Sequence, residues 1–162
     1  MISPVSSDLP FTIAFELPPG WALVSPDACG HPDAAYVAIR QKNVNDLVVT
    51  NFAINGFLAS PTVDVAALAA RYLASLQSRY PVTVLKSDIS AARMVAQLLQ
   101  LDYTENGSTI PLKQIQIINA LPSVDTQEAI AVLQMLLTCP VEVFDEAGPE
   151  FQQFMTTITP GL

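Results

Sequence analysis

The sequence predicts an α+β fold in which helices cover an antiparallel β-sheet. Three observations predict it: segments in which apolar and polar residues alternate, an Asn-Gly dipeptide between two of them, and one amphipathic helix in mid-chain. The expected order is β-β-β-α-β-β-β-β-α, because runs of strands separated by helices favour an antiparallel sheet over a parallel α/β fold. The 162 residues show no break in composition and no internal repeat, so residues 1–162 are expected to form one domain, with 1–9 a loose N-terminal segment.

Three strands are expected before residue 60. The first covers residues 11–17, where apolar and more polar residues alternate until Pro18-Pro19, which cannot continue a hydrogen-bonded ladder. Residues 25–34 have the composition of a loop. Residues 35–41 and 47–58, the latter with β-branched and aromatic side chains, are the second and third strands.

After residue 60 the apolar period becomes helical. The apolar stripe consists of Val65, Leu68, Ala69, Tyr72, Leu73 and Leu76. Ser60-Pro61 is expected to cap and start this helix, with Asp64 near the positive end of its dipole, and Pro81 is expected to end it. Leu68, Tyr72 and Leu76 are therefore expected to face the sheet.

The second half of the chain returns to strands. Residues 82–85 form a short strand, and 94–103 and 110–120 form a hairpin, because Asn106-Gly107 tolerates the positive φ values of a type I′ turn. Residues 121–127 are a loop, and 129–138 are apolar on both sides, as in a central strand. Residues 145–149 are expected to end the sheet before a last short helix that carries the apolar stripe Phe151, Phe154, Met155 and Ile158.

Composition excludes several classes of protein. The chain has 51% apolar and 14% charged residues with a net charge of −8, so it is neither disordered nor suited to bind nucleic acid. No segment has the length of an integral membrane span, and no signal peptide is visible at the start. The chain as given is expected in the cytoplasm, or in the cell envelope if an export signal has been removed.

The sequence offers no catalytic constellation, and no cofactor, catalytic residue or metal ligand is expected. His31 is the single histidine, so neither a zinc site built on Cys29-Gly30-His31 nor a Ser-His-Asp triad finds its other members, and His31 is expected to be a solvated loop residue. The glycines form no phosphate-binding loop. Cys29 and Cys139 are either two inert thiols or, if the fold brings them together, a disulfide.

Acidic residues gather near the C-terminus, where no base follows Lys113. They lack the alternating pattern of a calcium loop. Glu150 is expected in the first turn of the last helix and its neighbours as solvated charges. Asp145, Glu146 and Glu150 are the candidate contact for a basic patch on a partner, because an acidic field speeds encounter with basic surfaces and repels nucleic acid.

Several short motifs, taken in order, carry a family resemblance. They are Phe15-Glu-Leu-Pro-Pro-Gly-Trp21, Asn51-Phe52, the helix Val63-Asp-Val-Ala-Ala-Leu68 that leads to Ser78-Arg-Tyr-Pro81, the Asn106-Gly107 hairpin with Gln114, and Val143-Phe-Asp-Glu-Ala-Gly-Pro-Glu-Phe151. Their order resembles the PsbP/Mog1-like fold, and most of all the actinobacterial LpqN/LpqT-type proteins. The resemblance implies a non-enzymatic domain that binds other proteins or acts as an accessory factor.

The sequence therefore predicts a non-enzymatic binding or accessory protein. Low charge in an apolar chain leaves apolar surface exposed, so an apolar sheet face or groove is expected to engage a protein or a lipid-like partner, or a further copy of the chain. The alternatives are a small metal-assisted hydrolase that uses acidic residues, and a purely homo-oligomeric structural protein. Carboxylates converging with His31 in a pocket would favour the hydrolase, and a dry apolar groove would favour the binding protein.

Overall fold

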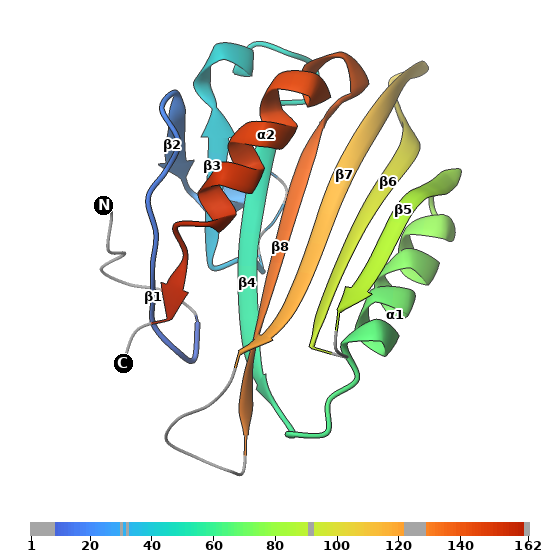
Figure 1. Cartoon of the computed structure of the whole chain (residues 1–162). Helices are drawn as coiled ribbons and strands as arrows, with labels where there is room; N and C mark the ends of the chain where they lie inside the picture. Colours follow the sequence, from blue (N-terminus) through green and yellow to red (C-terminus); the bar gives the residue numbers. More distant parts are fainter. Residues whose placement is uncertain (1–8, 30, 32, 91–92, 122–128, 161–162) are drawn as a thin grey trace.

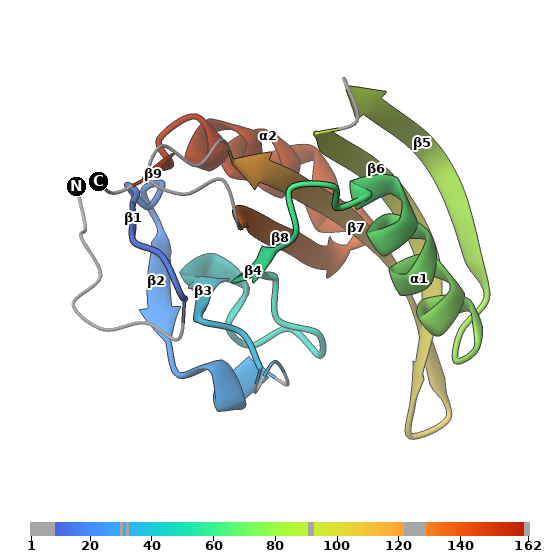
Figure 2. The same cartoon turned by 90° about the horizontal axis from the view of Figure 1, so that it is seen from below.

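The computed structural model describes residues 9–29, 31, 33–90, 93–121 and 129–160 (Figure 1). Its centre is a seven-stranded antiparallel sheet with the strand order β2-β3-β4-β8-β7-β6-β5. The two α-helices cover opposite faces of this sheet, as Figure 2 shows. The expected α+β class is confirmed. The expected loose segment 1–9 lies, except for Leu9, outside the described residues.

The bounds of the elements are as follows. The large sheet contains β2 (Trp21–Val24), β3 (Tyr36–Arg40), β4 (Asn51–Ala59), β5 (Val82–Ser90), β6 (Met94–Glu105), β7 (Ser108–Leu121) and β8 (Ile130–Pro140). A separate two-stranded sheet pairs β1 (Ile13–Ala14) with β9 (Thr159–Pro160). The helices are α1 (Val65–Gln77) and α2 (Phe144–Met155), and short 3-10 turns occupy Pro26–Cys29, Gln41–Asn43 and Val141–Val143.

The N-terminal strands differ from the prediction. The expected strand 11–17 shrinks to β1, although its alternation is real, since Ile13 and Phe15 are buried while Thr12 and Glu16 are exposed and Ala14 is half-buried. The large sheet instead begins at β2, which the sequence did not predict. Gly20, at φ +86°, turns the chain after the proline pair and leads it into a new strand rather than into a loop. The expected strands 35–41 and 47–58 are found as β3 and β4, although β4 begins only at Asn51.

Helix α1 is found where the apolar stripe predicts it, with a different start. Asp64 is the N-cap, and its Oδ1 accepts hydrogen bonds from the backbone nitrogens of Ala66 (3.0 Å) and Ala67 (3.3 Å). Ser60 therefore does not cap the helix. Leu76 is buried, and Leu68 and Tyr72 are half-buried against the clusters on the sheet, so the predicted face of the helix is confirmed.

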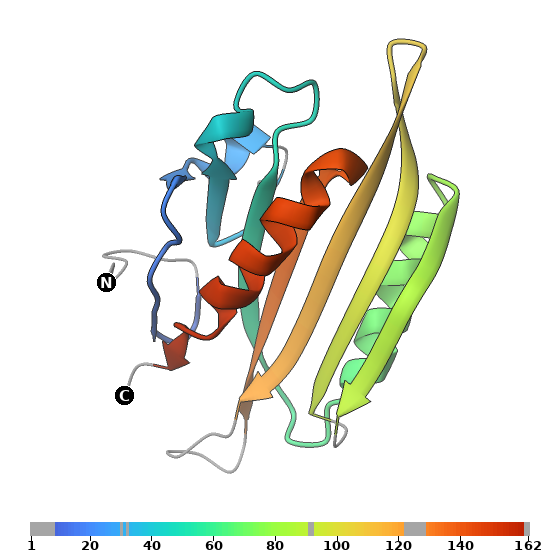
Figure 3. The same cartoon turned by 45° about the horizontal axis from the view of Figure 1, so that its top comes forward.

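The central hairpin is confirmed and the strand before it is longer than predicted. Asn106 and Gly107 have φ values of +51° and +81°, and the β6–β7 hairpin reaches beyond the rest of the sheet (Figure 3). The expected strand 82–85 continues to Ser90, because β5 pairs along β6 at the edge of the sheet. An edge strand is exposed on both faces, so its sequence need not alternate.

Helix α2 begins earlier than predicted. The segment 145–149, expected to be a loop, lies inside the helix together with Pro149. The 3-10 turn Val141–Val143 runs directly into the helix, so the helix starts before the Gly-Pro pair that suggests a break. Glu150 consequently lies in the middle of α2 and not in its first turn, which holds Asp145 and Glu146.

The two faces of the sheet have separate cores. Phe15, Phe52, Phe151 and Phe154 are fully buried under α2, and the Phe52 and Phe154 rings stack at 4.3 Å between centroids. Val65 of α1 packs on the other face among buried side chains of β6, β7 and β8. β8 supplies alternate residues to both cores, as predicted for a central strand.

Candidate functional site

A groove runs over the α1 face of the sheet, between α1 and the chain that leads into β3. It consists of two adjoining hollows of about 290 Å³ and about 620 Å³. His31, Tyr72 and Leu136 line both hollows, so we treat them as one groove. Its floor is the middle of the sheet, where β4, β8 and β7 lie next to one another.

The floor of the groove is polar because amide side chains occupy alternate positions on neighbouring strands. Asn51, Thr138 and Gln114 stand in one row across β4, β8 and β7. In the next row Gln116 of β7 stands beside Gln97 of β6. All five side chains belong to residues less than a tenth exposed, and each strand sends its intervening residues into the α2 core.

Two hydrogen-bonded chains organise these side chains. Tyr72 Oη donates to Gln114 Oε1 (2.9 Å), and Gln114 Nε2 donates to Thr138 Oγ1 (3.1 Å). Gln97 Nε2 donates to Gln116 Oε1 (3.1 Å). Burial raises the pKa of Tyr72 to about 12, so its hydroxyl stays protonated and continues to donate.

The Gln116 side chain has hydrogen-bonding capacity left over. Its Nε2 donates to none of the described residues. Among those residues, Thr50 Oγ1 is the only fully buried side-chain polar atom that lacks a partner, so Gln116 Nε2 is accessible from the groove. A bound molecule with an acceptor oxygen could therefore take this donor without an exchange of existing hydrogen bonds.

His31 is not the solvated loop residue that the sequence predicts. It is half-buried at the wall of the groove, where its Nε2 and Asn51 Oδ1 form a hydrogen bond of 3.1 Å. Burial lowers its pKa below the usual 6.5, against the opposing effect of this hydrogen bond. The imidazole is therefore neutral at pH 7, like the floor beside it.

The walls of the groove mix apolar and aromatic side chains. Leu76 and Leu101 line the larger hollow together with Tyr80 and Tyr103, whose ring centroids are 5.8 Å apart. A single carboxylate stands at each hollow, Asp33 at the smaller and Glu105 at the larger. The groove thus differs from the dry apolar surface that the sequence predicts, and from a pocket in which carboxylates converge on His31.

The acidic candidates lie on the opposite face, in α2. Arg40, whose side chain is only 9% exposed, donates from Nε to Glu150 Oε1 and from Nη2 to Glu150 Oε2, both at 3.0 Å. Trp21 Nε1 also donates to Glu150 Oε1 (2.7 Å). The hydrogen bonds from Arg40 have the largest effect on the pKa of Glu150. Together with the one from Trp21, they hold this pKa below its usual value, although burial acts in the opposite direction.

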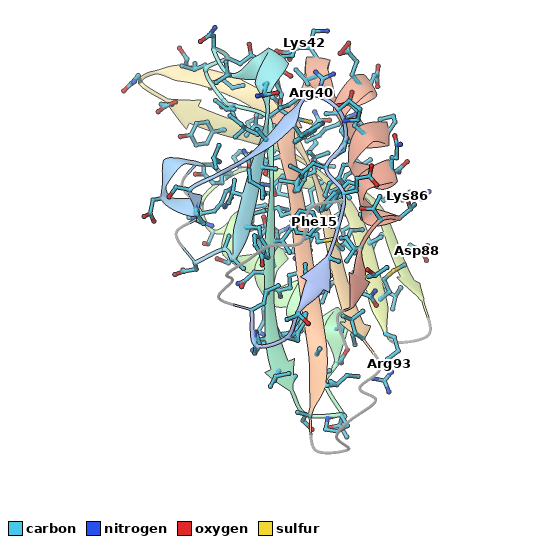
Figure 4. The ribbon with its side chains drawn as sticks, turned by 90° about the vertical axis from the view of Figure 1, so that its left-hand side faces the viewer. Phe15, Arg40, Lys42, Lys86, Asp88 and Arg93 are labelled. Atoms are coloured by element: carbon cyan, nitrogen blue, oxygen red, sulfur yellow. The ribbon has the colours of Figure 1, made fainter. Side chains whose placement is uncertain are left out.

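Glu146 shares the same cation. Arg40 Nη2 lies 3.0 Å from Glu146 Oε1, and Lys42 Nζ lies 3.4 Å from the same oxygen. Hydrogen bonds from Arg40 and then Lys42 lower the pKa of Glu146. Figure 4 shows Arg40 and Lys42 near each other at one end of the molecule. The structure therefore gives Glu146 and Glu150 partners within the chain, while Asp145 is exposed beside them.

The remaining candidates lie apart from the groove. Cys139 is a free, fully buried thiol under α2, and burial raises its pKa to about 12. The side chain of Cys29 is outside what the structure describes. Within the described part of the chain, no three His, Cys, Asp or Glu side chains are placed to hold a metal ion. No helix in that part has the length and apolar character needed to cross a membrane.

Sequence reasoning missed the amide floor, although a signal for it was present. A two-residue turn at Asn106-Gly107 fixes the register of its hairpin, and this register sets Gln97 opposite Gln116. Gln114 lies two residues before Gln116 and therefore on the same face. The sequence thus contained a polar cluster on one face of a predicted apolar hairpin.

Comparisons with known proteins identify the fold. No protein-family model and no curated protein matches the chain. Among solved structures, LpqN, described as involved in cell envelope biogenesis of Mycobacterium tuberculosis, matches 96% of this chain and 86% of its own with a TM-score of 0.66 and 15% identity. The cyanobacterial PsbP (CyanoP) from Synechocystis sp. PCC 6803 matches 92% of this chain and 86% of its own, with a TM-score of 0.52 and 10% identity.

A third structure, a protein of unknown function and putative regulator from Pseudomonas aeruginosa (PA94), covers 99% of this chain and 90% of its own at 20% identity, with a TM-score of 0.47. The first two matches show that this chain has the PsbP/Mog1-like fold and resembles LpqN. At these identities the likeness concerns the fold alone.

Proposed function

We propose that this PsbP/Mog1-like chain is a non-enzymatic binding or accessory protein that engages its partner through the groove on the α1 face. The observation that carries the proposal is the preformed amide floor, with the Gln116 Nε2 donor open to a bound molecule. Binding sites commonly combine apolar walls with a few oriented polar groups, and this groove has both.

The chemistry of the groove points to the kind of partner. The floor carries amides and hydroxyls, and the charged residues that line the two hollows, Asp33, Arg79 and Glu105, are few and of mixed sign. The groove therefore offers no concentrated counter-charge to offset the lost hydration of a charged group. Leucine and tyrosine side chains on the walls favour an apolar portion. A protein segment or a lipid-like molecule that presents uncharged polar groups to the floor fits both requirements.

The test is an NMR titration of the ¹⁵N-labelled protein with a panel of uncharged detergents, polyols and short neutral peptides. We expect chemical-shift changes for at least one probe at Gln116, Tyr72 and their neighbours on the floor. Gln116→Leu should weaken that binding by about fivefold, because one well-made hydrogen bond to a bound molecule contributes on the order of 1 kcal/mol.

Gln100→Leu is the matched control. Gln100 is a half-buried glutamine of the neighbouring strand β6 and lies on the opposite face of the sheet, so its substitution should leave binding unchanged. Shift changes confined to residues outside the groove would contradict the proposal. Chemical conversion of a probe during the titration would instead favour the hydrolase alternative.

We also propose Asp145, Glu146 and Glu150 as a contact for a basic patch on a protein partner. Support comes from the exposure of Asp145 and Glu146 at the start of α2. Glu150 binds Arg40 through both carboxylate oxygens, whereas Glu146 binds it through one and is exposed, so the test that disturbs the fold least is Asp145→Asn with Glu146→Gln, measured as the association rate at rising salt concentrations. An unchanged association rate with unchanged salt dependence would contradict the proposal, and these acids would then serve solubility alone.

A further inference from the structure

We propose that β5 is a self-association edge, which pairs antiparallel with β5 of a second copy about a two-fold axis at Ser87. β5 is the last strand of the large sheet, and among the residues that the structure describes it pairs with β6 alone (Figures 1 and 3). Its outer side therefore presents unpaired backbone N–H and C=O groups, which are the template for adding another strand. This inference is independent of the groove and its ligand.

The exposed apolar side chains on β5 distinguish it from an ordinary edge. Val84, Leu85 and Ile89 are 40%, 45% and 54% exposed. The other edge strand of the same sheet, β2, is only four residues long and begins with the buried Trp21. Long, apolar edges are rare on isolated domains because they invite pairing, so the β5 edge has the character of an interface.

The charges on β5 select the second copy as the occupant. A two-fold axis at Ser87 sets Lys86 opposite Asp88 of the second copy, and by symmetry forms this pair twice. Lys86 and Asp88 follow each other along β5 (Figure 4), and neither forms an ion pair with any residue that the structure describes. Directly opposed charges of opposite sign stabilise a strand pair.

Neighbouring registers are disfavoured by the same charges. An axis at Lys86 would oppose two lysines, and an axis at Asp88 would oppose two aspartates, each of which destabilises a strand pair. A foreign strand without an acid at the matching position would likewise leave Lys86 unpaired. Lys86 and Asp88 thus disfavour the pairing of other strands with this edge, and favour the second copy in this one register.

Both faces of the joined strands gain contacts in this register. Lys86 and Asp88 pair with Leu98 and Ala96 of β6, so the charge pairs lie on the α2 face. Ile89 pairs with Val95, whose side chain belongs to the α1 cluster, so it lies on the other face. In the proposed pairing, Ile89 lies opposite Leu85 of the second copy and close to its Val84. The pairing of β5 with β6 shifts register between Val84 and Lys86.

The test uses reciprocal charge reversal in the full chain, with mass measured by sedimentation equilibrium. We expect a wild-type dimer. Lys86→Asp and Asp88→Lys should each weaken the dimer by about tenfold or more, because both symmetric pairs become repulsive. An equimolar mixture of the two variants should recover dimers that contain one copy of each, since every opposed pair is then attractive again.

Arg71→Asp is the control. It makes the same change in net charge as Lys86→Asp on the exposed side of α1, so its dimer should match wild type. Thermal melts of all variants verify folding, which exposed substitutions should preserve. A wild-type protein that stays monomeric at the highest concentration reached, or a dimer unaffected by either reversal, would overturn the proposal, as would a mixture with no recovery.

Discussion

Arg40 joins parts of the chain that lie far apart in sequence. Its guanidinium binds both carboxylate oxygens of Glu150, a geometry in which two parallel hydrogen bonds fix the orientation of both groups. Asn43 also accepts a hydrogen bond from Arg40 Nη1 (2.8 Å). With Trp21 donating to the same glutamate, β2, β3 and α2 meet at one acid. Lysine could not replace Arg40 here, because a single ammonium cannot bind a carboxylate through two parallel hydrogen bonds.

Glu150→Gln should lower the free energy of unfolding by about 1–2 kcal/mol at pH 7, because hydrogen bonds to a charged group lose much of their strength when the charge is removed. The folded-state pKa of Glu150 is lowered, so its stabilising contribution is complete above the usual pKa of 4.5 and is lost as the pH falls through the lowered value. The difference in melting temperature between wild type and Glu150→Gln should therefore shrink below pH 4.5.

Thermal melts of both proteins at a series of pH values measure this effect. Gln152→Ala is the control. It lies on the exposed side of α2, leaves the Arg40–Glu150 ion pair intact, and should follow wild type at every pH. A constant difference across the acidic range would contradict the assignment of this stabilisation to the Glu150 charge.

At the scale of elements, α1 depends on its buried stripe. Leu76 is 4% exposed among Leu99, Leu101 and Leu112. Leu76→Ala should cost about 2–5 kcal/mol, because it removes buried methyl groups and leaves a cavity. Arg71→Ala, on the exposed side of the same helix, should change the free energy of unfolding by less than about 0.5 kcal/mol. Denaturant unfolding measures both, and equal small effects would show that the helix does not depend on this packing.

Elements with a strong period or a defined turn could be predicted, and elements at edges could not. The α1 stripe and the Asn106-Gly107 turn are local signals that tertiary contacts did not override. β5 escaped detection beyond residue 85 because its solvent-exposed residues need no alternation. The start of α2 escaped because Pro149 normally breaks a helix, whereas here packing of the helix on β8 outweighs it.

The candidate site was predictable only in part. A groove on the sheet was expected from composition, but its position depends on α1 and His31 approaching from separate parts of the chain. The polar row across β4, β8 and β7 depends on the pairing of β4 with β8, two strands distant in sequence, which no local pattern encodes. The partners of Glu146 and Glu150 depend on Arg40 in the same way.

For the whole molecule, we predict that stability is independent of metal. The two apolar cores hold the sheet from both faces, with aromatic rings stacked under α2. Treatment with a chelator should leave the melting temperature unchanged, as measured by differential scanning calorimetry. Metal analysis of the purified protein is the complementary measurement, and stoichiometric zinc or iron together with a fall in melting temperature would contradict this prediction.

The pairing of β4 with β8 also sets the order in which the chain can fold. Asn51 meets Thr138 across this pair, while Phe52 packs against Phe154, so the centre of the sheet closes only after β8 and α2 have been synthesised. The β6–β7 hairpin, by contrast, can form from neighbouring residues as soon as it is made. High contact order of this kind slows folding towards the range of milliseconds to seconds. During synthesis, the apolar faces of β3 and β4 therefore stay uncovered until β8 has been made. The nascent chain is most prone to aggregation in this interval.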